Sequence, residues 1–307
     1  MNLSDSPKQA IAVIIVTVFA LALGDTLIKG TSATFTLWQI FVLRSFFVVA
    51  FLIMLIRWRV PAVRLIPQQL TWTLIRSICL TFMWVAYYFS LAHVDLSIAA
   101  ATYYTLPLFI TLFSAAFLGD TVRPIGWIAV ILGFSGVLLI LEPRTTNFNT
   151  YALLPLVSAI LYATAMILTR SRCRNEHMFV LSLWLNLTML ALGLLATVLL
   201  YTVGASAEMK HAQPFLFGSW SSIDTAEIAA LAVLIISILI GSTGAAYAYQ
   251  KGRPATIATF DFAYVAFATM GGILMFGEHP TFRGLAGITL IVVAGILAVR
   301  SHASGAA

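Results

Sequence analysis

One stretch of the sequence occurs twice. Residues 90–137 and 248–295 align without a gap at a constant offset of 158 positions. The offset brings the pair Gly119-Asp120 onto Gly277-Glu278. Each copy consists of two apolar segments joined by a short turn that contains an acidic residue. A repeat of this kind in an apolar chain is typical of transporters built from two related halves.

The composition requires lipid as the main solvent. Of 307 residues, 61% are hydrophobic and 9% are charged, whereas a soluble domain carries about 25% charged residues. Ten apolar stretches reach or approach the roughly 20 residues that span a bilayer as a helix. They cover residues 10–30, 36–57, 70–92, 96–118, 123–142, 150–171, 177–203, 226–249, 254–276 and 282–300. Because these runs are continuous rather than alternating, we expect an all-α integral membrane protein with ten transmembrane helices.

The lysines and arginines predict the orientation. With the N-terminus in the cytoplasm, the inside segments hold Lys8, Arg57, Arg59, Arg64, Arg123, Arg170, Arg172, Arg174, Lys251, Arg253 and Arg300. The outside segments hold Lys29, Arg144, Lys210 and Arg283. This bias predicts that both tails, 1–9 and 301–307, are cytoplasmic. The net charge of +6 is then a topology signal, and scattered basic residues in short loops predict no nucleic-acid partner.

The repeat also predicts a mechanism. Each copy ends a unit of five helices, so the halves are expected at 10–142 and 150–300. Because five is odd, the second unit inserts upside down relative to the first. Two inverted halves have two near-equivalent arrangements, which expose a central site to one side of the membrane and then to the other. We therefore expect alternating access, with ancient duplication for packing alone as the alternative.

The repeated motifs carry a family resemblance. They are Ala92-His93-Val94-Asp95, Leu106-Pro107-Leu108-Phe109, Leu118-Gly119-Asp120 and Gly126-Trp127 in the first half, and Phe276-Gly277-Glu278, Gly284 and Ala294-Gly295 in the second. With them the chain resembles the drug/metabolite transporter superfamily, in the form of paired EamA-type domains. It departs from the family pattern with Val265 in the place of Pro107 and with Asp120 where the family usually has Glu.

The resemblance implies a bacterial inner-membrane permease for a small organic metabolite. Amino acids and related compounds are the leading substrate class, with export as the expected direction. Uptake of a vitamin or nucleoside-like cofactor such as riboflavin or S-adenosylmethionine is the alternative, followed by multidrug efflux or a channel. Glycines at 126, 133, 136, 284, 287 and 295 favour close helix packing within one chain or in a homodimer.

Charged side chains within the expected helices are candidate site residues, because each costs about 2.5–3.5 kcal/mol near the bilayer centre. Asp25 lies four residues before Lys29, so the two form either a local pair at the membrane edge or a pair at the mouth of a cavity. Arg44 lies near the middle of its helix and needs a carboxylate from the protein or from the substrate.

A second group lies on the expected helix 70–92. Arg76, Trp84 and Tyr87 share one helix face. Aromatic rings there could stack on a planar solute while Arg76 holds an anionic end. The alternatives are helix packing for the rings and extension of the Arg76 side chain to the cytoplasmic interface.

Asp261 is the strongest single candidate for a site residue. It lies near the middle of the helix expected over 254–276, and the offset places it opposite Tyr103. Pro107 removes a helix hydrogen bond at similar depth and is the candidate hinge, since interrupted helices mark transporter binding sites. Asp261 is expected to bind an ammonium group, carry a coupling proton or neutralise Arg44. Gln39 and Asn186 are weaker candidates, and an interhelical hydrogen bond also explains Asn186.

No enzymatic activity is expected. The five histidines, at 93, 177, 211, 279 and 302, lie in joints, at helix ends or in the tail. The sequence contains no phosphate-binding loop and no nucleophile motif. Cys79 and Cys173 have no motif spacing. The sequence therefore predicts no cofactor and no metal site, and partners limited to a small-molecule substrate, the lipid bilayer and a second copy of the chain.

Overall fold

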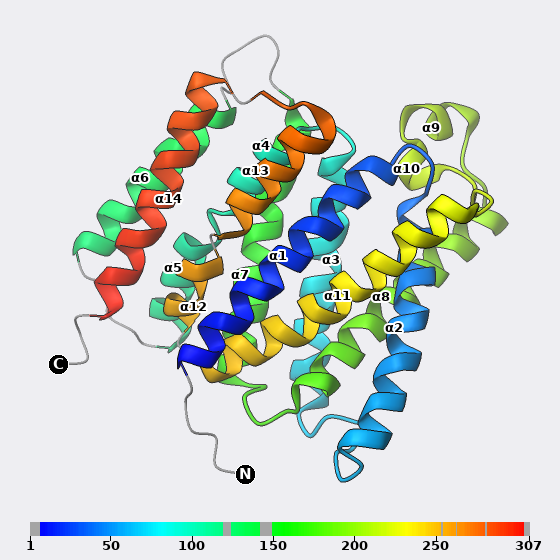
Figure 1. Cartoon of the computed structure of the whole chain (residues 1–307), viewed down its shortest axis with the longest axis horizontal. Helices are drawn as coiled ribbons and strands as arrows, with labels where there is room; N and C mark the ends of the chain where they lie inside the picture. The colour runs from blue at the N-terminus through cyan, green and yellow to red at the C-terminus, as the bar shows by residue number, and fades with distance from the viewer. Residues whose placement is uncertain are drawn as a thin grey trace.

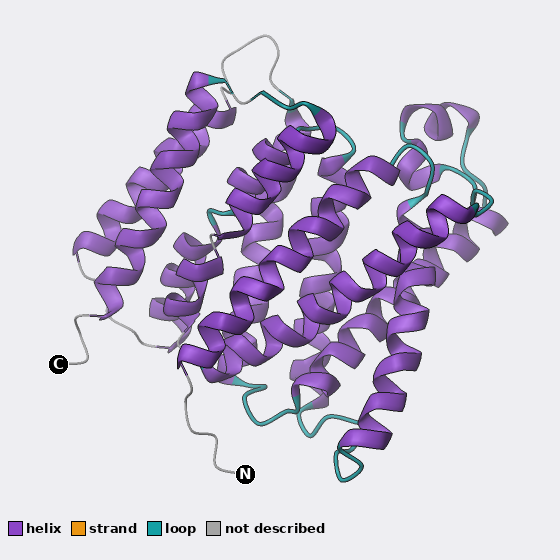
Figure 2. Ribbon diagram, viewed as in Figure 1, coloured by secondary structure: helices purple, strands orange, loops and turns teal. Residues whose placement is uncertain are grey.

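The computed structural model describes residues 7–118, 124–141, 149–252, 254–261, 263–279 and 281–303, and these residues are helical without strands (Figures 1 and 2). The first half contains α1 (Pro7–Thr31), α2 (Leu37–Arg59), α3 (Leu70–Leu91), α4 (Leu96–Tyr103), α5 (Leu106–Leu118) and α6 (Pro124–Leu141). The second contains a 3₁₀ turn (Thr150–Leu153), α7 (Leu154–Ser171), α8 (Met178–Thr202), α9 (Ala207–Ala212), α10 (Pro214–Phe217), α11 (Thr225–Lys251), α12 (Pro254–Asp261), α13 (Ala263–Phe276) and α14 (Phe282–Ala303).

Seven of the described helical segments are long and apolar enough to cross a membrane. Three shorter apolar helices, Pro124–Leu139, Ala263–Phe276 and Phe282–Ala294, accompany them. Large apolar side chains are exposed on the outer surface, for example Trp58, Leu274 and Phe282. An all-helical multi-pass membrane protein is thus confirmed. Gly119, Asp120, Arg123, Arg144, Arg253 and most of the two tails, which entered the sequence predictions, lie outside the described residues.

Local signals explain where several helices begin. The Thr36 hydroxyl accepts a hydrogen bond from the Gln39 N–H (3.2 Å) and starts α2. Asp224 and Glu227 form a reciprocal capping box at the start of α11. The segment between α8 and α11 carries the two short helices α9 and α10, and α10 begins at Pro214.

The main contacts join a helix that precedes α7 in the chain to α7 or to a later helix. α1 packs against α11 and α13, and α7 packs against α3 and α5. α4 contacts α13, and α5 contacts α12. α2 lies against α8, and α6 lies along α14 at one edge of the molecule (Figure 1). Gly136 permits this last approach, because a Cβ there would come within 2.7 Å of the Gly287 carbonyl oxygen.

The segment expected as one helix over 96–118 is interrupted. α4 ends at Tyr103, Tyr104 and Thr105 form a turn, and α5 begins at Leu106. The Thr105 N–H donates to the Thr102 carbonyl (3.2 Å), a shorter-range bond than in an α-helix. Pro107 has no N–H to donate to the carbonyl of Tyr103, four residues earlier. The interruption therefore lies directly before the proline.

Candidate functional site

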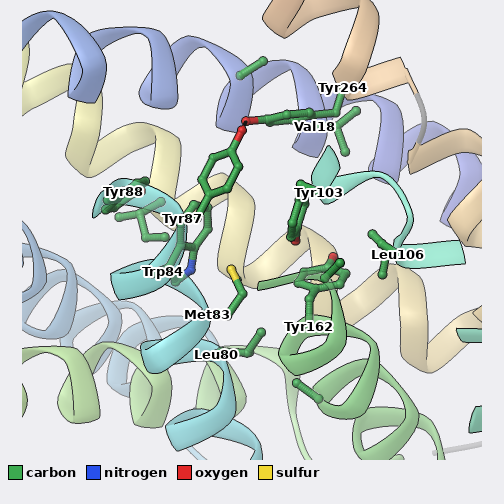
Figure 3. Close-up of a cluster of buried hydrophobic side chains, with 14 of the residues drawn as sticks. Val18, Leu80, Met83, Trp84, Tyr87, Tyr88, Tyr103, Leu106, Tyr162 and Tyr264 are labelled. Atoms are coloured by element: carbon green, nitrogen blue, oxygen red, sulfur yellow. Dashed lines mark hydrogen bonds between the residues drawn. The ribbon is translucent and has the colours of Figure 1, made fainter. Parts of the chain in front are cut away.

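Tyrosines fill the centre of the helix bundle. The chain has 10 tyrosines, and the seven buried ones, Tyr87, Tyr88, Tyr103, Tyr104, Tyr162, Tyr249 and Tyr264, come from both halves. Figure 3 shows the Tyr87 and Tyr264 side chains meeting at their hydroxyl ends, with Tyr103 between Tyr87 and Leu106. The ring centroids of Tyr87 and Tyr103 are 5.1 Å apart, and those of Tyr103 and Tyr162 are 5.8 Å apart.

Asp25 reaches this cluster from α1 and is 1% exposed. The Tyr264 hydroxyl donates to Asp25 Oδ2. The Tyr87 and Tyr264 hydroxyls are in turn 2.7 Å apart. No described residue lies in hydrogen-bond geometry to the second carboxylate oxygen, Oδ1, which is buried, and the Tyr88 hydroxyl and the Arg44 charge both act on this carboxylate. Asp25 therefore has one satisfied oxygen and one that a ligand could use.

Asp261 reaches the same cluster from the end of α12. Its Oδ1 accepts from the Tyr104 hydroxyl (3.1 Å), and its Oδ2 accepts from the Tyr249 hydroxyl (2.7 Å). The side chain is buried at 2% exposure. Both oxygens are thus satisfied by neutral hydroxyl groups from α11 and from the interruption between α4 and α5.

Arg44 is buried on α2 at 1% exposure. Its Nη1 donates to the Tyr88 hydroxyl (2.9 Å), and its Nη2 lies 3.7 Å from Met189 Sδ. Its Nε is buried without a hydrogen-bond partner among the described residues. The carboxylate that the sequence led us to expect beside Arg44 is absent at ion-pair distance within the described chain, where the one such pair is elsewhere. Arg44 therefore does not directly neutralise Asp261.

Arg76 is not extended to the surface. It is 1% exposed, its Nε donates to Thr169 Oγ1 (2.6 Å), and its Nη1 donates to the Leu181 carbonyl (3.5 Å). These bonds join α3 to α7 and α8. Trp84 and Tyr87 lie in the tyrosine cluster, with the Trp84 and Tyr88 ring centroids 4.8 Å apart. The shared helix face predicted from the sequence therefore divides into an anchoring arginine and a central aromatic group.

Two weaker candidates lie outside the cluster. The Gln39 side chain exchanges hydrogen bonds with the backbone of Ser221, at 2.8 and 3.0 Å, and so ties α2 to the segment before α11. Asn186 Nδ2 donates to the Ser182 carbonyl (2.9 Å) one turn earlier in α8. Among the described residues, no group of three His, Cys, Asp or Glu side chains is arranged to hold a metal ion.

Lys29 does not pair with Asp25. Its Nζ donates to the Val94 carbonyl (2.6 Å) and lies 3.4 Å from Glu278 Oε1. Glu278 also caps α4, because Oε1 accepts from the Leu96 N–H (2.7 Å) and Oε2 from the Ser97 N–H (3.0 Å). We call Lys29, Val94–Ser97 and Glu278 the Glu278 clasp. It joins α1, α4 and the end of α13 at the end of the bundle where α1 terminates.

Gly277 and Glu278, the second copy of the repeated Gly-acid pair, build this clasp. Gly277 has a φ of 63°, a left-handed conformation that favours glycine. The following Glu278 N–H returns to the Gly272 carbonyl (3.2 Å), which ends α13 and turns the carboxylate toward α4. Burial raises the pKa of Glu278, but hydrogen bonds from Ser97 and Leu96 and the Lys29 charge outweigh it, so the pKa lies below its ordinary value.

Sequence reasoning missed several members of the central cluster. Tyr88, Tyr104, Tyr249 and Tyr264 were not singled out as candidate site residues, although each bonds a candidate charge or its partner. A signal was present, because tyrosine in membrane proteins is enriched at the interfaces. All ten tyrosines lie within the expected apolar segments, and Tyr249 is the last residue of one of them, so this signal alone does not separate the seven core tyrosines from the other three.

Comparisons with known proteins agree with this architecture. Residues 8–142 match the model of the EamA-like transporter family. A pseudopaline exporter of Pseudomonas aeruginosa is 25% identical over 97% of this chain and 98% of its own length. A riboflavin transporter of Rhizobium johnstonii is 28% identical over 71% of this chain and 66% of its own.

An S-adenosylmethionine uptake transporter of Rickettsia felis is 21% identical over 75% of this chain and 71% of its own length. One protein crystal structure superimposes with a TM-score of 0.70 at 18% identity, covering 98% of this chain and 100% of that one. At this identity the superposition shows a shared fold.

Proposed function

We propose that this chain, which belongs to the drug/metabolite transporter superfamily as an EamA-type permease, is a secondary transporter that exports an amino acid or a related zwitterionic metabolite. That the chain is a small-molecule transporter and not an enzyme follows from its family and relatives. The zwitterionic substrate, the direction and the mechanism are the proposal.

One observation carries the substrate class. Asp25 Oδ1 is a buried acceptor without a partner, and Arg44 Nε is a buried donor without a partner, within the described chain. Leaving such groups unsatisfied costs about 1–3 kcal/mol each. A substrate with an ammonium group and a carboxylate would satisfy both, and the surrounding tyrosines and Trp84 would contact its side chain.

Asp261 is assigned a different role. Its two oxygens already accept from Tyr104 and Tyr249, which leaves the ammonium-binding alternative to Asp25. A carboxylate held by neutral hydroxyls gains or loses a proton without breaking an ion pair. We therefore assign the coupling proton to Asp261, and the hinge between the two states to the turn before Pro107.

The proposed architecture is ten membrane-spanning helices in two inverted halves, 10–142 and 150–300. The reciprocal packing supports it. If α1, α3, α4, α5 and α6 correspond to α7, α11, α12, α13 and α14, then exchanging the halves converts each of the observed pairs α1–α11, α1–α13 and α4–α13 into another observed pair. Such exchangeable contacts are what alternating access between inverted repeats requires.

The proposed location is the cell inner membrane with both termini cytoplasmic. α1 begins and α14 ends at the same end of the bundle (Figure 1). The same end carries Arg57 and Arg59 at the end of α2, Arg170 at the end of α7 and Lys251 at the end of α11. The excess of basic residues at this end supports a cytoplasmic placement. The Glu278 clasp would then close the opposite, outer side.

The share of this chain that each relative matches supports export. The relative named as an exporter matches 97% of this chain, whereas the riboflavin transporter and the S-adenosylmethionine uptake transporter match 71% and 75%. Transport of either compound is therefore the principal competing outcome in the experiment below.

The test is counterflow into proteoliposomes that contain the purified protein. A panel of radiolabelled amino acids, riboflavin and S-adenosylmethionine is presented outside vesicles that are loaded with the same unlabelled compound. We expect saturable, transient accumulation of an amino acid. Arg44→Gln should lower this flux at least tenfold, because it removes a charged hydrogen-bond donor worth about 1.5–3 kcal/mol.

The matched control is Arg57→Gln, which changes an exposed arginine in the last turn of the same helix. It should keep wild-type flux. Arg44→Lys separates charge from shape, since lysine keeps the charge and loses the planar fork. Accumulation of riboflavin instead of an amino acid would overturn the substrate class, because riboflavin carries neither an ammonium group nor a carboxylate. S-adenosylmethionine carries both, so its accumulation would keep the zwitterionic class and replace a plain amino acid by a larger derivative. Flux that does not saturate and shows no counterflow would identify a channel.

A further inference from the structure

A basic cavity lies at the end of the bundle where α1 begins. It has a volume of about 550 Å³ and lies between the segment after α2, the segment between α7 and α8, and the end of α11. Arg64, Arg174 and Lys251 line it, together with a single carboxylate, Glu176. Glu176 Oε1 accepts from the Gln69 N–H (2.6 Å), so this carboxylate also holds the adjoining loop.

The lining is positively charged at neutral pH. Three cations face one carboxylate. Burial lowers the pKa of His177, which also lines the cavity, and so disfavours its charged form. A cavity with this lining attracts a monoanionic or dianionic group. The tyrosine cluster does not contribute to it, since none of its seven members lines the cavity.

An apolar groove continues from this cavity along the outer surface. The groove has a volume of about 470 Å³ and runs between Val13 and Val16 of α1 and Ile240 and Gly244 of α11. Met178 and Tyr247 line both the groove and the basic cavity. The absence of a side chain at Gly244 keeps the two helices close, because a Cβ there would collide with Thr17.

The two sites together match one amphipathic molecule. Val16 is 58% exposed, so the groove opens to the surroundings of the helices, which for a membrane protein are acyl chains. Tyr247 lies at the junction, and its hydroxyl donates to Gln9 Oε1 (3.2 Å). Tyrosine at such a junction is typical of the level where headgroups meet hydrocarbon.

We propose that this continuous cavity and groove bind one anionic phospholipid, with the phosphate headgroup at Arg64, Arg174 and Lys251 and an acyl chain between α1 and α11. Basic pockets between helices at the cytoplasmic level are suited to such headgroups. The lipid would bridge α1, α8 and α11 and the loops that join α2 to α3 and α7 to α8. This inference does not depend on the substrate of the transporter.

The test measures lipid binding to the full-length protein in a neutral detergent. Phosphatidylglycerol, phosphatidylcholine with the same acyl chains and inorganic phosphate are titrated separately, with bound lipid counted by native mass spectrometry and anion binding followed by thermal shift. We expect phosphatidylglycerol to bind at least tenfold more tightly than phosphatidylcholine. The double variant Arg64→Gln/Lys251→Gln should weaken phosphatidylglycerol binding about 25-fold, at roughly fivefold for each basic residue removed.

A second variant tests the groove. Val16→Trp fills it and should weaken phosphatidylglycerol binding at least fivefold, without changing the thermal shift that inorganic phosphate causes. Arg57→Gln and Phe46→Trp, which change exposed residues on α2, are the matched controls and should bind like the wild type. Equal binding of the two phospholipids would overturn the headgroup assignment. An unaffected Val16→Trp together with full competition by inorganic phosphate would reduce the site to one for a free anion and overturn the lipid proposal.

Discussion

Asp25 and Asp261 are two buried carboxylates in one tyrosine cluster, and they differ in how completely they are hydrogen-bonded. Asp261 has a tyrosine hydroxyl on each oxygen, Tyr104 on one and Tyr249 on the other. Asp25 accepts from Tyr264 on Oδ2, while its Oδ1 has no hydrogen-bond partner among the described residues. An unsatisfied buried acceptor lowers the stability of the folded protein, so the open Oδ1 of Asp25 is destabilising.

The difference suggests a division of labour. A carboxylate with an open oxygen can bind a cationic group directly, whereas a fully bonded carboxylate must first lose a tyrosine partner. We therefore place substrate binding at Asp25 and proton exchange at Asp261. The same comparison extends to Glu278, whose carboxylate accepts from backbone N–H groups and lies beside the cation Lys29.

Exchanging the two core carboxylates for amides gives the largest expected effect. Asp25→Asn should weaken substrate binding about 10- to 100-fold, because it replaces a charged hydrogen bond worth about 1.5–3 kcal/mol. Asp261→Asn should leave binding within about threefold while abolishing or uncoupling transport. Substrate affinity is measured by thermal shift on purified protein, and transport is measured in proteoliposomes across a range of external pH.

Both variants must reach the membrane in wild-type amounts for this comparison to hold. Transport by Asp261→Asn that keeps the pH profile of the wild type would remove Asp261 from the mechanism. Wild-type affinity in Asp25→Asn would assign the substrate to other residues of the cluster.

Removing single tyrosine hydroxyls should give a smaller effect. Tyr264→Phe deletes the donor to Asp25 Oδ2 and should weaken substrate binding about fivefold, at roughly 1 kcal/mol for one hydrogen bond. Tyr249→Phe leaves Asp261 its bond from Tyr104 and should change affinity less than twofold. Titration of both variants with the substrate identified by counterflow measures the two losses of affinity and compares them. Equal losses in the two variants would contradict the assignment of Asp25 as the binding carboxylate.

The smallest effect is expected at the Glu278 clasp. The pKa of Glu278 is lowered in the folded state, so its contribution to stability is present above the ordinary glutamate pKa of 4.5 and is lost as the pH falls through the lowered value. Glu278→Gln should cost about 1 kcal/mol at pH 7 and should remove this part of the acid dependence.

Thermal unfolding of the purified wild type and of Glu278→Gln between pH 3 and pH 7 measures this acid dependence of stability. Glu208→Gln, a change at an exposed residue of α9, is the matched control. If Glu278→Gln lost stability in acid as steeply as the wild type, the clasp would not be the source of that dependence.

The fold was predictable to a large extent because lipid imposes simple rules. Continuous apolar runs predict helices, and the interruption before Pro107 follows from the missing N–H. The repeat singled out Gly277-Glu278 without predicting the clasp, in which Gly277 supplies a left-handed turn. Its partners were not predictable, because Leu96 and Ser97 lie more than 180 positions earlier in the sequence and meet Glu278 only through packing.

The residues of the candidate site were easier to predict from the sequence than their hydrogen-bond and ion-pair partners. Asp25, Arg44 and Asp261 were selected as charges within the expected helices. Trp84 and Tyr87 were selected because they share a helix face with Arg76, and Tyr103 because the repeat aligns it with Asp261. The structure brings these six residues into one region of the bundle. Their partners were assigned incorrectly where proximity in sequence was the guide. Lys29, four residues from Asp25, pairs instead with Glu278 just after the end of α13, whereas Asp25 accepts from Tyr264 near the beginning of α13.

The turn between α4 and α5 has a consequence for how such a chain can evolve. Because residue 107 is proline, the carbonyl of Tyr103 has no N–H four residues later to accept from, and it lies beside the tyrosine cluster. This acceptor belongs to the main chain, so replacement of Tyr103 or of the rings around it leaves it in place. Descendants can therefore exchange the side chains around this turn while they inherit the same interruption of the backbone.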